Sequence, residues 1–284
     1  MSLPDLSDSK TINALPLTSP KRVRALLAHY NLHADKRFGQ NFLIDTGVLE
    51  AIVKSANLAS TDTVFEVGPG LGVLTYELAQ RVANVITVEL DSRILPVLEH
   101  TLAEFDNVNI LHADALKVDL TDLPDPTVMV ANLPYNIATP LLRNVLASGR
   151  FTRIICLIQK EVAERLAAKP STPAYGALSL WTQYYADVTV LRNVKPSSFW
   201  PPPKVTSAIV QLKIDRARQP APALFKVIEH AFQHRRKTLK KNLLMAGYAD
   251  TRVQDVLEKL ELNPKVRAEA LPLATFEQLV ALLE

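Results

Sequence analysis

The sequence predicts an α/β protein in which a parallel, doubly wound sheet is followed by a small, all-helical C-terminal domain. Short β-branched runs alternate with helical stretches of about ten residues from residue 63 onward. A glycine-rich turn directly follows the first run, and beyond Ile214 apolar residues recur only at three- and four-residue spacing. Parallel neighbouring strands need helical crossovers, so this alternation favours a doubly wound sheet.

The segment before the sheet is expected to hold an extension, two helices and a loop. Residues 1–20 show no periodicity and are predicted to form a flexible N-terminal extension. A short basic amphipathic helix is expected over 21–30, and the loop 36–43 leads into a helix over 46–56.

The sheet and its helices are predicted in order along the chain. Strands are expected at 63–67, 85–89, 108–111, 128–130 and 154–158, with helices at 73–82, 92–104, 139–146 and 161–168. Two later apolar stretches, 186–193 and 205–214, flank the proline-rich loop 195–204 and predict an antiparallel pair that closes the sheet edge.

The C-terminal region is predicted to be helical throughout. After a linker at 215–222, helices are expected at 224–232, 237–245, 251–260 and 275–283. The predicted parts are therefore the extension 1–20, an α/β domain 21–214 and a helical domain 215–284.

The composition excludes several classes of protein. With 48% hydrophobic and 21% charged residues, the chain of 284 residues has the balance of a soluble globule with a core. Its longest apolar runs contain five residues, whereas a membrane span needs about 20. No secretory signal is visible, so we expect no membrane partner and a cytoplasmic location. The single cysteine, Cys156, excludes a disulfide scaffold and is expected to be a packed core thiol; the histidines do not cluster at metal-ligand spacing, so no metal is expected.

Positive charge is concentrated in two clusters, although the net charge is only +3. The first basic cluster lies within 21–37. The second lies within 216–241, where eight Lys or Arg residues accompany one acidic residue, Glu229. Such clusters favour a polyanion partner, and the alternative for each is a solvated helix face.

The first predicted strand ends in the glycine-rich turn Glu66-Val-Gly68-Pro-Gly70-Leu-Gly72, and a helix follows at once. Glycines at alternate positions let the backbone turn tightly and approach a ligand at the C-terminal edge of the sheet. The spacing differs from that of dinucleotide enzymes and lacks the Lys-Ser/Thr of a P-loop. The alternative is a strand-to-helix turn without a ligand.

Two carboxylates follow the next strands at the same edge. Glu89 comes 21 residues after Gly68, where a carboxylate can accept both ribose hydroxyls of a nucleoside bound over the glycine turn. Asp114 follows the third strand and would suit an adenine amino group, although such a residue alone is more often a helix cap.

The fourth strand leads into Asn132-Leu133-Pro134-Tyr135, the most specific signal in the sequence. The Asn side-chain oxygen and the adjacent backbone carbonyl can accept hydrogen bonds from an exocyclic amine and direct its lone pair toward an electrophile. Tyr135 can stack on the base that carries the amine, while Pro134 fixes the turn. The alternative is a turn with a core tyrosine.

These motifs resemble the S-adenosylmethionine and adenine motifs of Rossmann-like N6-adenine methyltransferases. Further segments at 38–43, 199–208 and 235–243 narrow the resemblance to the small-subunit rRNA adenine dimethyltransferases of the bacterial RsmA/KsgA type. It is collinear from about residue 36 to about residue 244. The resemblance implies a Rossmann-like, S-adenosylmethionine-dependent domain that dimethylates the N6 amines of two adjacent adenosines in the 3′-terminal hairpin of 16S rRNA. It further implies a monomer that acts, without a metal, on an assembling 30S subunit.

The resemblance also implies roles for single residues. Those implied to bind the cofactor are Asn41, Leu43, Gly68, Gly70, Glu89, Asp114 and Asn132. Asn41 and Leu43 would contact its methionine end or adenosine, and Gly68 would pass close to its carboxypropyl group. Glu89 would hold its ribose and Asp114 its adenine. The implied catalytic residues are Asn132 and the Leu133 carbonyl, which would position the target amine, Pro134, and Tyr135 and Phe199, which would sandwich the target base.

RNA phosphates are expected to be held by cations of both basic clusters. In the first these are Lys36 and Arg37; in the second they are Arg235, Arg236, Lys237, Lys240 and Lys241. The five of the second cluster are predicted to fall on neighbouring turns of one helix, around Leu239, Leu243 and Leu244. The alternative is that part of this cluster pairs with acidic residues.

Two rival functions stay open from the sequence. A large-subunit rRNA adenine methyltransferase of the macrolide-resistance type would share fold and reaction, but Leu133 and the Arg235-Arg-Lys-Thr-Leu stretch favour the small-subunit enzyme. A non-catalytic nucleic-acid-binding relative is disfavoured by the intact Asn132–Tyr135 motif.

Overall fold

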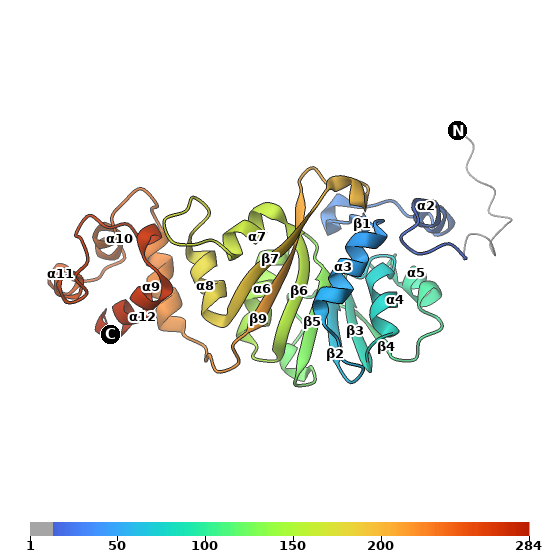
Figure 1. The fold of residues 1–284 in the computed structure, drawn as a ribbon, viewed down its shortest axis with the longest axis horizontal. Coiled ribbons are helices and arrows are strands. Elements are labelled where there is room, and N and C mark those ends of the chain that lie inside the picture. The colour runs from blue at the N-terminus through green and yellow to red at the C-terminus, as the bar shows by residue number, and fades with distance from the viewer. Residues whose placement is uncertain (1–13, 284) are drawn as a thin grey trace. The chain divides into compact units, whose positions relative to one another are not determined.

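The structure, a computed structural model, describes residues 14–283, without the side chain of Lys36. Its main feature is a seven-stranded sheet with the order β4-β3-β2-β5-β6-β9-β7 (Figure 1). The strands are β2 Thr63–Val67, β3 Asn84–Glu89, β4 Val108–His112, β5 Thr127–Asn132, β6 Phe151–Gln159, β7 Ala186–Val194 and β9 Ser207–Ile214. Strands β2 to β6 pair in parallel, and β9 runs antiparallel to β6. The predicted α/β class with a doubly wound sheet is therefore confirmed.

The helices of the sheet region begin close to their predicted positions. They are α2 Pro20–His29, α3 Thr46–Ala56, α4 Val73–Ala79, α5 Leu95–Thr101 and α6 Ala138–Ala147. Asp45 caps α3 by accepting a hydrogen bond from the backbone N–H of Val48 at 3.1 Å. Helix α5 starts three residues later than predicted, because Asp91 accepts from the N–H of Arg93 and holds residues 91–94 in a turn.

The core lies between the sheet and these helices. All five residues of β2 are buried, as expected for a central parallel strand that is covered on both faces. Helix α3 packs on β5 and β6, and α4 packs on β3 (Figure 1). Cys156 is fully buried in β6, and burial raises the pKa of its thiol to about 12, so the predicted packed core thiol is confirmed.

A second, two-stranded sheet was not predicted. Strand β1, Phe42–Leu43, pairs antiparallel with β8, Phe199–Trp200, and brings the proline-rich loop beside the segment that precedes α3. Ser198 strengthens this junction by donating a hydrogen bond to the Asp45 carboxylate at 2.7 Å. Two-residue strands carry no periodicity that a sequence pattern could reveal.

The described chain divides into two compact units. The first holds residues 14–163 and 189–214, and the second holds 164–188 and 215–283. The second unit contains α8 Ala177–Tyr185, α9 Pro222–Phe232, α10 Leu239–Met245, α11 Asp250–Lys259 and α12 Leu273–Leu283. The division differs from the expected boundary at 214, because α8, which no pattern predicted, packs on α9 and α12 through rings such as Trp181 and Phe225.

Residues 14–20 do not behave as the flexible extension expected over 1–20; residues 1–13 lie outside the described chain. Leu17 belongs to the core of the first unit, and Thr18 is buried. The Thr18 hydroxyl also shares a 2.8 Å hydrogen bond with the hydroxyl of Thr46 at the start of α3.

The second basic cluster does not lie on one helix, which corrects the prediction. Helix α9 ends at Phe232, and α10 begins only at Leu239, where the Thr238 hydroxyl accepts from the N–H of Lys241. The cations at positions 235–237 therefore occupy a turn before α10. Asn242 holds that turn, since its amide donates to the backbone carbonyls of Ala231 and His234.

Candidate active site

Two adjoining hollows lie at the carboxyl ends of the parallel strands. The first hollow, of about 670 Å³, is lined by residues 38–43, by the glycine-rich turn and start of α4, by Glu66 and Glu89, and by Asn132–Tyr135. The second hollow, of about 430 Å³, includes Leu90, Ala113 and Asp114. Both share Phe38, Gly68, Glu89 and Pro134, so they are neighbouring parts of one site. This is the edge at which open α/β sheets bind ligands.

The glycine-rich turn brings the first strand against the Asn132–Tyr135 segment. Gly68 has a φ of +71°, and a Cβ atom placed on it would lie 2.9 Å from Cγ of Pro134. A larger residue would clash with the proline and strain the backbone. Glycine at this position therefore allows two loops of the site to touch.

Glu89 lies at the end of β3, on the wall common to both hollows. Its carboxylate accepts a 2.8 Å hydrogen bond from the backbone N–H of Asp91, which fixes the side chain. Burial raises the pKa of Glu89, and the backbone N–H groups of Asp91, Leu90 and Gly70 oppose that shift. The structure places Glu89 where the sequence predicted a ribose-binding carboxylate.

Asp114 lines the second hollow, on the adenine side of the predicted nucleoside site. It also accepts a 3.0 Å hydrogen bond from the backbone N–H of Leu116. No helix begins here, so Asp114 holds a turn rather than a helix start; its other oxygen, 3.9 Å from the Lys117 ammonium, remains able to accept from a ligand.

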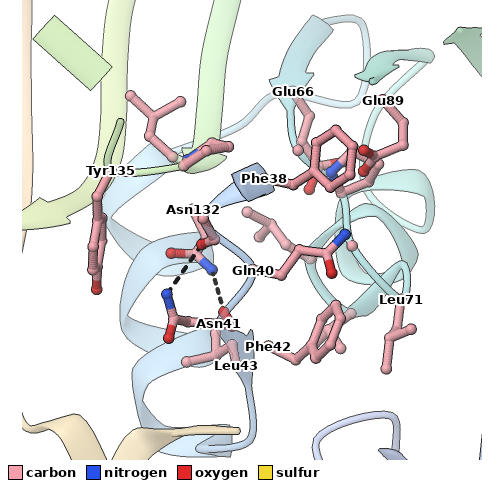
Figure 2. Close-up of a pocket in the computed structure, with 18 residues that line it drawn as sticks. Phe38, Gln40, Asn41, Phe42, Leu43, Glu66, Leu71, Glu89, Asn132 and Tyr135 are labelled. Carbon is pink, nitrogen blue, oxygen red and sulfur yellow. Dashed lines mark hydrogen bonds between the residues drawn. The ribbon is translucent and has the colours of Figure 1, made fainter. Parts of the chain in front are cut away.

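Asn132 is held by the loop that precedes the sheet. Its side-chain Nδ2 donates to the backbone carbonyl of Asn41 at 3.3 Å, shown as a dashed line in Figure 2. Since the amide nitrogen is used in this way, the Oδ1 atom is the group left to accept from a ligand. Figure 2 shows Tyr135 on one side of the Asn132–Asn41 pair, with Glu66 and Glu89 on the other.

Tyr135 presents its ring to the first hollow and anchors its hydroxyl elsewhere. The hydroxyl shares a 2.5 Å hydrogen bond with Ser207, a fully buried residue at the start of β9. Burial raises the pKa of Tyr135. Leu133, between Asn132 and Pro134 in the sequence, is buried. Its N–H donates to the carbonyl of Leu157 at 3.1 Å, which ties the turn to β6.

Asn41 and Leu43 line the first hollow as expected, but Phe199 lines neither hollow. Phe199 is 1% exposed and belongs to the core of the first unit, since β8 directs it inward opposite Leu43. Tyr135 is thus present at the site without the aromatic partner that the sequence predicted.

Two residues of the site were missed. Glu66 is fully buried, and burial raises the pKa of its carboxyl to about 7, opposed by a hydrogen bond from the Thr75 hydroxyl at 2.6 Å. Gln40 donates to the Asp91 carboxylate at 2.9 Å and so fastens the 38–43 segment to the end of β3. Glu66 lies in the glycine-rich turn motif and Gln40 in the segment 38–43, so their positions in these motifs could have indicated them.

Some basic side chains are paired within the protein, and others are exposed without a carboxylate partner. Arg235 donates to the Pro173 carbonyl at 2.8 Å and lies 3.7 Å from Glu269, while Lys240 pairs with Asp250 at 2.8 Å. Lys237 contacts the sulfur of Met245 at 3.0 Å. Arg37 pairs with Asp35 at 2.7 Å, and the side chain of Lys36 is outside the description. Within residues 14–283, Arg236 and Lys241 are exposed without a carboxylate partner.

The described chain has neither a metal-binding cluster nor a membrane-spanning helix. No group of three or more His, Cys, Asp or Glu side chains within residues 14–283 is arranged to hold a metal ion. Over the same residues, every helix is too short or too polar to span a bilayer.

The fold and the site define a class: a Rossmann-like, S-adenosylmethionine-dependent methyltransferase. The sequence model for the family described as ribosomal RNA adenine dimethylase matches residues 31–284, and the chain belongs to that family.

Individual relatives agree with this membership. The chain is 44% identical to a ribosomal RNA small subunit methyltransferase A from Deinococcus radiodurans, over 95% of this chain and 93% of the relative. Identity is 42% to the protein of that name from Lactiplantibacillus plantarum, over 92% of this chain and 94% of the relative. Among solved structures, a dimethyladenosine transferase from Plasmodium falciparum has a TM-score of 0.74 at 30% identity, covering 84% of this chain and 95% of that one. The 23S rRNA methyltransferase ErmE has a TM-score of 0.67 at 26% identity, covering 86% and 99%.

Proposed function

We propose that this chain transfers methyl groups from S-adenosylmethionine to the N6 amines of two adjacent adenosines in the 3′-terminal hairpin of small-subunit (16S) rRNA. We further propose that it does so as a monomer in the cytoplasm, on an assembling 30S subunit. The observation that carries the proposal is the Asn132–Asn41 hydrogen bond, which leaves the Asn132 oxygen as an acceptor beside the ring of Tyr135.

The residues that line the two hollows fit the proposed cofactor. Glu89 is buried on their common wall with one oxygen fixed by the Asp91 N–H, so its carboxylate can accept from ribose hydroxyls. Asp114 can accept from an adenine amino group in the second hollow. Phe38 and Leu90 supply apolar surface for the adenine ring. When bound, the cofactor supplies a methyl group that is already activated by the positive charge of a sulfonium sulfur.

Asn132 would act on the target amine. Its Oδ1 and the Leu133 carbonyl accept the two N6 hydrogens, which turns the nitrogen lone pair toward the methyl carbon. S-adenosylmethionine would supply the methyl group to this nitrogen and would keep the electron pair of its broken C–S bond on sulfur, and the proton of the alkylated amine would pass to water. Orientation and electrostatic alignment suffice for such a step, so we propose that it needs neither a metal nor a protein nucleophile.

Tyr135 would hold the base that carries the amine. The Ser207 hydrogen bond restrains the phenol, so the ring keeps one orientation toward the first hollow. A flipped adenine would stack on that ring. Because Phe199 is in the core, we assign the stacking role to Tyr135 alone.

The comparisons favour small-subunit rRNA as the substrate, and exposed cations without a carboxylate partner are available to contact it. Identity is higher to the relatives named as small-subunit enzymes, 44% and 42%, than to ErmE, 26%. The exposed cations Arg236 and Lys241 would contact RNA phosphates, whereas Arg235 and Lys240 are engaged within the second unit.

The test is a transfer assay with labelled S-adenosylmethionine and separated, unmethylated small and large ribosomal subunits. We expect label in the small-subunit RNA alone, recovered as N6,N6-dimethyladenosine at two neighbouring positions. Label in the large-subunit RNA would replace the proposal by the macrolide-resistance type of activity. Binding to subunits without any transfer would favour a non-catalytic relative.

A further inference from the structure

Trp200 is an aromatic side chain on the outside of the molecule. The two residues of β8 point to opposite sides, as in any strand, so Phe199 enters the core while Trp200 remains 38% exposed. At this exposure part of the tryptophan side chain is accessible to a ligand.

A cation accompanies this ring. The guanidinium of Arg24 on α2 lies 5.7 Å from the ring centroid of Trp200, within the range of a cation–π contact. Its Nε also donates to the Pro20 carbonyl at 3.2 Å, which restrains the guanidinium. The paired groups are thus partly ordered before any ligand arrives.

The two segments that carry this pair contain positive charge only. Helix α2 with Tyr30, residues 20–30, has Lys21, Arg22 and Arg24 and no acidic residue. Residues 189–206, around Trp200, have Arg192, Lys195 and Lys204 and again no acidic residue. An exposed aromatic beside several cations matches the chemistry of single-stranded nucleic acid, in which bases stack and phosphates need counter-charges.

Trp200 is also close to the site of methyl transfer. It pairs directly with Phe42, which lines the first hollow and follows Asn41, the residue whose carbonyl holds Asn132. Opposed residues of antiparallel strands lie about 5 Å apart, so Trp200 is on the order of 10 Å from the Asn132 amide. At about 3.4 Å per stacked nucleotide, this is a distance of about three nucleotides.

We propose that Trp200 and Arg24 form a stacking platform for an unpaired base of the RNA substrate, within a few nucleotides of the adenosine that is methylated. This inference rests on the proposed function, because it takes the RNA as the substrate of the neighbouring hollow. The platform binds by stacking and charge, so it holds a flanking base without regard to its identity.

The first experiment measures KM and kcat for unmethylated small ribosomal subunits with Trp200→Ala, Trp200→Phe and a matched control, Val205→Ala, at a residue of the same loop that is 43% exposed. Loss of one stacked base should raise the KM of W200A by about 5- to 150-fold. The W200F variant should recover most of this loss, and V205A should match the wild type. The affinity for S-adenosylmethionine and the melting temperature should be unchanged in all three.

A second measurement keeps the platform testable even if the proposed substrate is wrong. Short single-stranded RNA oligonucleotides are titrated into wild type and W200A, with binding followed by anisotropy of a label on the RNA. Weaker binding by W200A together with wild-type failure in the transfer assay would overturn the proposed function and support the platform.

Three outcomes would overturn the platform. The first is equal KM values for W200A and V205A together with equal oligonucleotide binding. The second is a fall in melting temperature or cofactor affinity that accounts for the whole loss in W200A. The third is concentration-dependent self-association of wild type that W200A abolishes, which would make a second copy of the chain the partner of Trp200.

Discussion

The strand-end site of the first unit and the second basic cluster, in the second unit, both form internal hydrogen bonds, with opposite consequences for ligand binding. At the strand ends, Asn132 and Glu89 each have one group fixed by a backbone atom and another group left for a ligand. In the second basic cluster, Arg235 bonds to the Pro173 carbonyl and lies near Glu269, and Lys240 pairs with Asp250. Internal partners therefore prepare side chains for binding in one region and remove them from binding in the other.

Residue type alone therefore does not identify a binding group. A cation near a carboxylate contributes little further attraction to a distant phosphate, since the pair is already neutral. An amide or carboxylate with one fixed atom loses less entropy on binding and presents its second atom in one direction.

The strongest test of the prepared site is Asn132→Ala. We expect turnover to fall by roughly 100- to 1,000-fold, because the lost oxygen acts on the amine as the transition state forms. Cofactor affinity and melting temperature should stay near the wild-type values. Single-turnover methylation of unmethylated small subunits measures this, and turnover within a few-fold of wild type would remove Asn132 from the reaction.

The second test, Glu66→Gln, measures how much folding stability is lost when a buried carboxyl of the site ionises. The pKa of Glu66 is raised from 4.5 to about 7 in the folded chain, so the fold favours the protonated form. That stabilisation is fully present below about pH 4.5 and is lost as pH rises through about 7, a change of at most about 3 kcal/mol. Glutamine removes the ionisation. In urea titrations E66Q should therefore gain stability over wild type at pH 8, and the gain should shrink toward pH 5; a constant difference would contradict the buried ionisation.

The third test is Glu89→Ala, with Asp106→Ala as the control because Asp106 is an exposed carboxylate away from both hollows. Loss of a carboxylate that accepts from two hydroxyls should weaken binding by roughly 2–3 kcal/mol, about 30- to 150-fold in the dissociation constant. Isothermal calorimetry with S-adenosylmethionine measures it. Unchanged affinity in E89A would place the ribose elsewhere.

The smallest expected effect separates free from engaged cations. Replacing Arg236 and Lys241 with Ala should lower the slope of log affinity against log salt by about 0.7–0.9 for each lost phosphate contact. Replacing Arg235 and Lys240 instead should lower the melting temperature and leave the slope near the wild-type value, since these cations bond within the unit. Binding isotherms with small subunits at several salt concentrations decide between them. Equal slopes for both double variants would show that internal partners do not keep Arg235 and Lys240 from binding RNA.

The sheet and the strand-end residues were predictable because their signals are local. Strand β2 matches its predicted range, 63–67, since a β-branched run ends at a glycine turn that no strand can continue through. Glu89, Asp114 and Asn132 were predictable for a related reason: the carboxyl ends of parallel strands meet at one edge of the sheet.

The features that were missed depend on contacts between distant residues. The inward position of Phe199 follows from the pairing of β8 with β1, which are separated by more than 150 residues. The engagement of Arg235 depends on Pro173 and Glu269, neither of which is near it in the sequence. Helix α8 has a broad apolar surface because rings such as Trp181 and Tyr184 pack on Phe225 of α9, and this hides the one-sided pattern typical of a surface helix.

The hydrogen bond between Asn132 and Asn41 would couple the two proposed binding events, of cofactor and of RNA. Asn41 belongs to the segment that walls the first hollow, and Asn132 carries the acceptor proposed for the RNA amine. A ligand that steadies this segment also steadies the acceptor, and thermodynamic reciprocity makes the benefit mutual. If bound cofactor raises the affinity for RNA by some factor, bound RNA must raise the affinity for the cofactor by the same factor, whichever binds first.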